Sequence, residues 1–177
     1  MRKLLGALLF IGAFFFAWSG QQTIDVQAKT FNKSFANTLK QGRLPNNVGK
    51  VGTKFETIYY KVNGQVFGSE SFNSYSTNKA TYYYDIQQYE TIYYSQKTKA
   101  MEEVFSITYS KKAIRKYLKP LAYYAPYGDG YVSKAKSDLY KAGRFYAYID
   151  KSGSKTRVVI ATKQAMKNYF MLSKIYE

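Results

Sequence analysis

The stretch at residues 144–161 reads RFYAYIDKSGSKTRVVIA, which is the pattern of a β-hairpin. Aromatic and β-branched residues fill 144–150 and 155–161, and such residues favour extended strands. Between them lies KSGS, a polar segment with a glycine that is typical of a turn. The stretch therefore predicts two antiparallel strands joined by a short turn.

The same composition extends over most of the chain and predicts more strands. All 20 tyrosines and eight of the 12 phenylalanines follow residue 28. We expect strands at residues 53–62, 65–75, 81–95 and 104–109, with Asn63 and Gly64 forming a hairpin turn between the first two. The connections are too short for helical crossovers between parallel strands. The predicted fold class is β-rich α+β: a mainly antiparallel sheet, similar to a small barrel or sandwich, with one to three short helices packed on it.

Ser110 can cap the clearest predicted helix, which Pro120 would end. Ile114, Tyr117, Leu118 and Leu121 recur at helical spacing and should face the core. Further helices are expected at residues 31–39 (weakly), at 133–142, and from Thr162 to about Ile175, with a strand at 169–172 as the alternative. Residues 41–52 are expected to form a loop.

The pentapeptide ETIYY occurs twice, beginning at Glu56 and at Glu90. The 34-residue spacing is that of tetratricopeptide repeats, but the surrounding residues do not match at this offset. We interpret the two copies as one kind of strand used twice. If the strands were neighbours in register, Glu56 and Glu90 could approach to about 5 Å, the separation used by retaining glycosidases.

The N-terminal residues have the three parts of a secretory signal peptide. Arg2 and Lys3 are followed by an uncharged apolar run at residues 4–18, and small residues at Val26 and Ala28 suit cleavage after Ala28. We therefore expect residues 1–28 to be removed; an uncleaved anchor is the alternative. The remaining chain divides into an N-terminal helix and loop at 29–52 and a single β-rich domain at 53–177.

The net charge of the chain and the absence of cysteine and histidine limit the classes of function that it can have. From residue 29 onward the chain has 25 basic and 10 acidic residues, a net charge of +15, and 21 of the basic residues are lysine. Lysine acts as a hydrated point charge, which favours binding to polyanions in general over specific readout of nucleic acid. A charge that only maintains solubility is the alternative.

Cysteine and histidine are absent, which excludes disulfides, a lipid-modified cysteine, histidine-based triads and ordinary zinc sites. The S-x-x-K motif at residues 133–136 also occurs at 76–79 and 152–155, so we attribute it to chance. Short Asp- and Gly-containing stretches at 127–131 and 150–153 lack the ligand series of a calcium loop and are interpreted as turns. We expect no cofactor and no metal.

Two groups of residues are the candidates for ligand contact. The basic side of the helix after Ser110 is a candidate polyanion-binding face, although the solvated back of a packed helix has the same pattern. It consists of Lys111, Lys112, Arg115, Lys116 and Lys119. Aromatic rings that can stack on a glycan are the second group. These are Tyr123, Tyr124, Tyr127 and Tyr131.

The VQAK sequence ending the signal-like segment, the absence of cysteine, and the lysine- and tyrosine-rich composition resemble small exported proteins of lactic-acid bacteria. This resemblance implies no activity and no site residue. The expected function is that of a secreted, non-enzymatic protein held at the surface of a Gram-positive cell by anionic envelope polymers such as teichoic acids, or by glycan. The alternatives are a small envelope-polymer hydrolase using Glu56 and Glu90, or a non-specific binder of extracellular nucleic acid.

Overall fold

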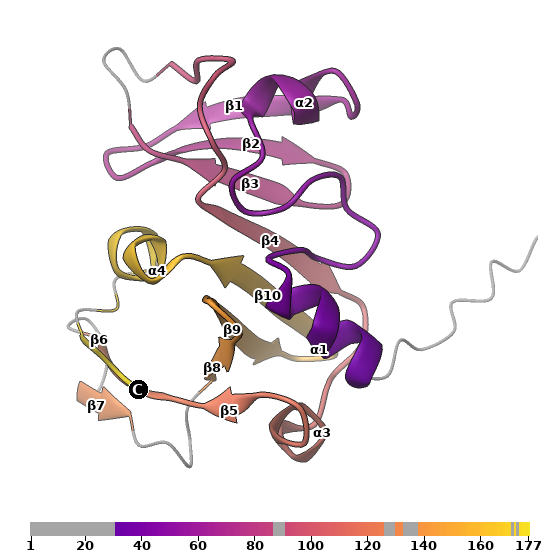
Figure 1. The fold of residues 1–177 in the computed structure, drawn as a ribbon, viewed down its shortest axis with the longest axis vertical. Coiled ribbons are helices and arrows are strands. Elements are labelled where there is room, and N and C mark those ends of the chain that lie inside the picture. Colours follow the sequence, from indigo (N-terminus) through magenta and orange to yellow (C-terminus); the bar gives the residue numbers. More distant parts are fainter. Residues whose placement is uncertain (1–30, 87–90, 126–129, 133–137, 171, 173) are drawn as a thin grey trace, which may run out of the picture.

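Eight antiparallel strands form one continuous sheet that runs from β1 to β5 (Figure 1). The computed structural model describes residues 31–86, 91–125, 130–132, 138–170, 172 and 174–177, so the expected signal peptide lies outside it. The strands, in spatial order, are β1 (Gly64–Gly68), β2 (Asn73–Thr77), β3 (Thr81–Tyr84), β4 (Ala100–Phe105), β10 (Lys155–Ala161), β9 (Phe145–Ser152), β8 (Leu139–Ala142) and β5 (Lys119–Pro120). A second sheet contains β11 (Lys174–Tyr176), β6 (Ala122–Ala125) and β7 (Gly130–Val132).

The predicted β-rich α+β class with a mainly antiparallel sheet is confirmed. The large sheet does not close into a barrel, because β1 and β5 remain its two edges. The hairpin at 144–161 is also confirmed as β9 and β10, with Lys155 opposite Ser152 and Ala161 opposite Tyr146. Gly153 adopts a φ of +59° in its turn, a conformation that glycine reaches at little cost.

Four short helices are present in the described part of the chain: α1 (Lys33–Lys40), α2 (Phe55–Tyr59), α3 (Lys111–Arg115) and α4 (Lys163–Tyr169). The predicted caps Ser110 and Thr162 accept hydrogen bonds from the backbone N–H groups three residues later, at 3.2 and 3.1 Å. Both helices are shorter than expected. Residues 119–120 and 174–176 form strands that pair with β8 and β6 instead.

The largest correction concerns residues 53–62, which contain the helix α2 instead of a strand. Phe55 and Ile58 are both buried, and a three-residue separation brings two side chains to one face of a helix but to opposite faces of a strand. Asn63 and Gly64 therefore lead from α2 into β1 and do not form a hairpin turn. The hairpin that exists joins β1 to β2 within the segment predicted as one strand, through a turn at residues 69–72.

Three further boundaries differ from the sequence predictions. Only residues 81–84 of the long extended stretch at 81–95 form a strand, residues 87–90 lie outside the described residues, and 91–95 have no strand structure. The strand expected at 104–109 begins earlier, at Ala100, and ends at Phe105. Leu139–Ala142, expected to be helical, is β8, and residues 133–137 of that segment are outside the description.

Both faces of the large sheet are buried, each by a different set of elements. One hydrophobic cluster contains side chains of α1, α2 and α3, with Val158 and Ile160 of β10 beneath them. The other contains side chains of α4, β6 and β11, with Val159 and Ala161 of β10. Alternate residues of β10 thus enter two cores, which explains why residues 158–161 are apolar on both faces of the strand.

The large sheet consists of two halves with the same order of elements. In the first half α2 is followed by β1, β2, β3 and β4, and in the second half α3 is followed by β5, β8, β9 and β10. Each half is a four-stranded meander, and the two join antiparallel where β4 meets β10. The small strands β6 and β7 are inserted into the second half, between β5 and β8 (Figure 1).

The two helices that open these halves end in the same way. Val62 N–H donates to the Ile58 carbonyl at 3.1 Å, and Leu118 N–H donates to the Ile114 carbonyl at 3.0 Å. A buried threonine also fixes the segment before each helix: the Thr98 hydroxyl donates to the Thr53 carbonyl, and the Thr156 hydroxyl donates to the Ile107 carbonyl. The repeated arrangement is typical of an internal duplication.

Candidate functional site

The predicted basic face lies on α3 and the residues that leave it. Ile114 and Leu118 are buried beneath, as the helical spacing predicts, and Tyr117 is half-buried. Leu121 is also buried, but it belongs to the cluster on the opposite face of the sheet. Lys111 is engaged by Asp138 at 2.5 Å. The other four members of the predicted face are exposed: Lys112, Arg115, Lys116 and Lys119.

Ion pairs engage five carboxylates of the described residues. One network joins Arg157 to Glu102 through two hydrogen bonds of 2.8 Å, and Tyr83 donates a further hydrogen bond to Glu102 at 2.6 Å. The other paired carboxylates are those of Glu56, Asp85, Asp138 and Glu177. Because the chain has far more basic than acidic residues, this pairing leaves a surplus of positive charge on its surface.

The four tyrosines proposed for glycan contact do not form one exposed group. Tyr123 is buried, its ring packs edge-on against that of Tyr148, and burial raises the pKa of its hydroxyl. Tyr124 on β6 is 40% exposed and lies opposite Tyr131 of β7 in the strand register. Tyr127 lies outside the described residues.

The two ETIYY copies meet, although not as paired strands. Glu56 N–H donates to the Tyr94 carbonyl at 3.1 Å, and the Tyr60 and Tyr94 rings stack with centroids 6.0 Å apart. Tyr59 packs edge-on against Tyr94. Tyr60 is 76% exposed and Tyr94 is 49% exposed, so the contact forms an aromatic surface cluster that the strand interpretation missed. Glu56 pairs with exposed Lys54 at 3.2 Å, while Glu90 lies outside the described residues, so the proposed catalytic pair is not assembled by the part that is described.

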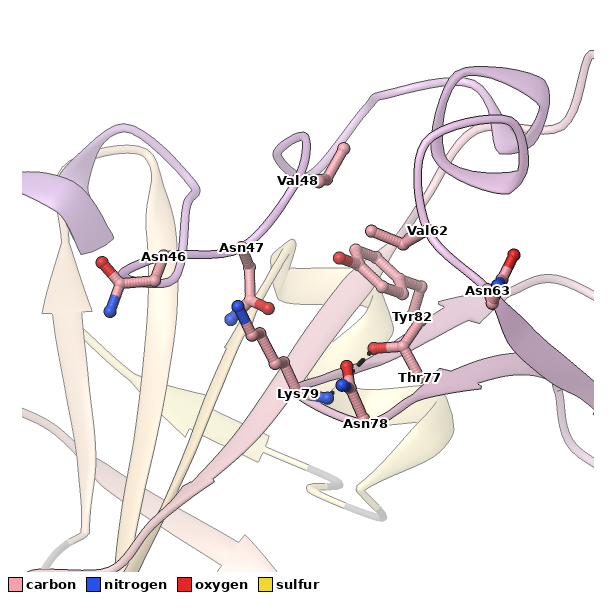
Figure 2. A pocket seen from close by; sticks show the side chains of 9 residues that line it. All are labelled: Asn46, Asn47, Val48, Val62, Asn63, Thr77, Asn78, Lys79 and Tyr82. Carbon is pink, nitrogen blue, oxygen red and sulfur yellow. Dashed lines mark hydrogen bonds between the residues drawn. The ribbon is translucent and has the colours of Figure 1, made fainter. Parts of the chain in front are cut away.

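A polar cleft of about 440 Å³ lies between three separate segments of the chain, one of which closely follows Tyr60 of this cluster in the sequence (Figure 2). The segments are the loop after α1, the α2–β1 connection and the β2–β3 turn. The lining residues are Asn46, Asn47, Val48, Val62, Asn63, Thr77, Asn78, Lys79 and Tyr82. Four amides and one lysine therefore surround the cleft, and its lining includes no carboxylate.

Buried groups hold the walls of the cleft in place. Tyr82 is 1% exposed; burial raises its pKa to about 12, although a hydrogen bond from the backbone of Val48 acts in the opposite direction. The Thr77 hydroxyl closes the β2–β3 turn by donating to the Ala80 carbonyl at 2.9 Å and accepting from two N–H groups of the turn. Figure 2 shows the Lys79 side chain extending toward Asn47 across the opening.

Asn46 has a φ of +62°, a left-handed conformation that asparagine tolerates better than most residues. Its neighbour Asn47 donates its amide to Glu103 of β4 at 2.5 Å, which ties the loop to the sheet. Sequence reasoning identified none of the cleft residues as a site. The sequence predicts only a loop at residues 41–52 and a hairpin turn at Asn63 and Gly64.

Neither a membrane-spanning helix nor a metal-binding group is present in the described ranges. No helix there is long and apolar enough to span a membrane. No three Asp, Glu, His or Cys side chains there are grouped to hold a metal ion. Comparison with known proteins finds no matching family model, no similar curated protein and no similar solved structure.

Proposed function

We propose that this chain is a non-catalytic binding protein that is exported and held at the cell surface by anionic envelope polymers. The observation that carries the proposal is that most carboxylates are in ion pairs, whereas many lysines are exposed. Ion pairs engage most carboxylates of the described residues, whereas Lys112 of α3, Lys116 at the end of this helix and Lys119 of β5 are exposed to solvent. A polymer with a phosphate in each repeating unit would complement such a surface.

The attraction acts between exposed charges, so dissolved salt should screen it. The Debye length falls from about 8 Å at 0.15 M ionic strength to about 3 Å at 1 M. Lysine contributes charge without the planar fork that favours bidentate base recognition, so we expect affinity for polyanions without sequence preference.

The first experiment measures retention of purified protein on cell walls with and without teichoic acid, at both salt concentrations. We expect retention on complete walls at 0.15 M, most of it lost at 1 M or after removal of teichoic acid. N-terminal sequencing of protein recovered from the culture tests cleavage after Ala28. Retention that ignores salt would contradict the proposal, and equal retention on DNA would favour a general polyanion binder instead.

A matched pair of triple variants locates the contact. Lys112, Lys116 and Lys119 are replaced by glutamine in one variant, and the exposed Lys33, Lys61 and Lys97 in the other, so that both lose the same charge. If α3 carries the contact, only the first variant elutes at clearly lower salt. Equal weakening would mean that the whole surface contributes.

A further inference from the structure

The two halves of the sheet differ at one matching place, the turn between their second and third strands. In the second half this is the β8–β9 turn, and the N-terminal segment packs tightly against it. A Cβ atom on Gly143 would lie 3.1 Å from the Lys40 carbonyl oxygen, and one on Gly42 would lie 2.7 Å from the Phe145 ring. This contact between the N-terminal segment and the β8–β9 turn, called the junction below, therefore leaves no room for an added Cβ atom at either glycine.

The same N-terminal segment also reaches the β2–β3 turn of the first half, but there it leaves the cleft of about 440 Å³. Tyr82 and Phe145 correspond, because each is the first residue after its turn that enters the shared core. Phe145 contacts the segment at Gly42, whereas Tyr82 and Val48 border an opening (Figure 2). The fold thus contains a junction that one half fills and the other leaves accessible.

The groups around the opening have a definite hydrogen-bonding character. Asn47 uses its amide N–H for Glu103 and therefore presents its carbonyl oxygen as an acceptor. Asn46, Asn63 and Asn78 make no side-chain hydrogen bond to other described residues. Lys79 is the only charged residue of the lining, and it forms no ion pair within the described ranges.

We propose that this cleft binds a polyol phosphate, that is, a hydroxyl-rich unit with one anionic group. Amide groups donate to and accept from hydroxyls, and the ammonium group of Lys79 suits a phosphate oxygen. Glu103 lies behind Asn47 and would oppose a ligand of high negative charge, which favours a phosphodiester unit over a cluster of phosphates. The inference rests on the proposed function, because a teichoic acid-like polymer is the source of such units.

The test titrates the isotope-labelled exported protein with glycerol 1-phosphate, glycerol or inorganic phosphate and follows the amide resonances. We expect shifts concentrated at residues 46–48, 62–63 and 77–82, with glycerol 1-phosphate binding about tenfold more tightly than either fragment, as one additional hydrogen-bonded contact would give. Equal affinity for inorganic phosphate, or shifts centred on α3, would overturn the cleft as the site.

Two variants separate the contributions of charge and amide. Lys79→Gln should weaken glycerol 1-phosphate binding about tenfold, the loss of one charge-assisted hydrogen bond, while Lys61→Gln leaves it unchanged. Asn46→Gly removes an amide where glycine fits the backbone, so binding should fall without loss of thermal stability. Unchanged binding in both Lys79→Gln and Asn46→Gly would contradict the proposal.

Failure of this inference is distinguishable from failure of the proposed function. The variant lacking Lys112, Lys116 and Lys119 should lose wall retention yet keep its affinity for glycerol 1-phosphate. Protein that is retained on walls in a salt-dependent manner but shows no shift with glycerol 1-phosphate would overturn the cleft and leave the surface-charge proposal intact.

Discussion

Gly64 shows how one residue can be essential for a reason that its sequence context does not reveal. Asn-Gly is a strong hairpin signal because its turn needs positive φ angles. In the structure Gly64 instead opens β1, opposite Thr77. A Cβ atom there would lie 2.4 Å from the Ser76 carbonyl oxygen and 2.8 Å from the Tyr75 ring. The glycine is required by close approach to its neighbouring strand.

Gly64→Ala should therefore destabilise the protein by about 1–3 kcal/mol, the usual range for overpacking against groups that cannot move freely. Urea unfolding followed by circular dichroism measures the loss. Gly153→Asn is the matched control, because that position has open space around it and a φ that asparagine accepts. A Gly64→Ala protein as stable as the control would show that β1 can shift away from β2.

At the scale of elements, the pentapeptide ETIYY demonstrates that local preference does not decide its structure. The first copy is a helix because Phe55 and Ile58 are both drawn into the core over β2 and β3. In the second copy Ile92 is buried, and the described residues after Glu90 are neither helix nor strand. The isoleucine is buried in both copies, so the difference in backbone comes from the surrounding structure and not from the pentapeptide itself.

Asp85 joins three elements, since it follows β3, pairs with Lys99 before β4 at 2.7 Å, and accepts a hydrogen bond from Tyr169 at the end of α4. Burial opposes ionisation of this carboxyl, but the hydrogen bonds from Lys99 and Tyr169 outweigh it and hold its pKa below the ordinary 3.8. A lowered folded pKa adds stability above the ordinary value, and this stability is lost as the pH falls through the folded pKa.

Asp85→Asn should therefore be less stable than the parent protein at pH 7, and the difference should shrink at pH 3. Urea unfolding at the two pH values tests this. Glu70→Gln, which changes an exposed carboxyl, is expected to show little difference at either pH. A loss of stability in Asp85→Asn that is equally large at both pH values would mean that the side chain stabilises the protein by its packing and not by its charge.

At the scale of the whole molecule, two similar halves share one hydrophobic cluster. Ile58 of α2 and Ile114 of α3 occupy matching positions and are 0% and 2% exposed. When Ile58 is aligned with Ile114, the only similar residue pairs around the two helices are apolar, such as Val62 with Leu118. The sequence comparison therefore does not reveal that the two halves are related in structure. The repeat that is visible, ETIYY, connects two segments within the first half.

If the halves form one cooperative unit, Ile58→Ala and Ile114→Ala should each cost about 2–5 kcal/mol, the range for removing a buried aliphatic side chain. Each variant should unfold in a single transition monitored by fluorescence and by circular dichroism. Thr57→Ala and Lys112→Ala are exposed controls on the same helices. A second, separate transition in either isoleucine variant would show that the halves unfold independently.

The sequence alone determined the features that depend on short-range chemistry. It identified the β9–β10 hairpin through its aromatic and β-branched residues and its glycine turn, the caps Ser110 and Thr162 through their hydroxyls, and the antiparallel class through its short connections. It also established the surplus of positive charge, which is a property of composition.

Only the tertiary structure decided which apolar residues share a core, and through this the helix at residues 55–59, the place of Gly64 and the meeting of the two ETIYY copies. The cleft depends on three segments that are far apart in the chain and that carry ordinary turn residues. Asparagine and lysine in a turn have the same local pattern whether they face open solvent or one another. Long-range packing supplies the difference, because it sets the distance between segments that local sequence cannot encode.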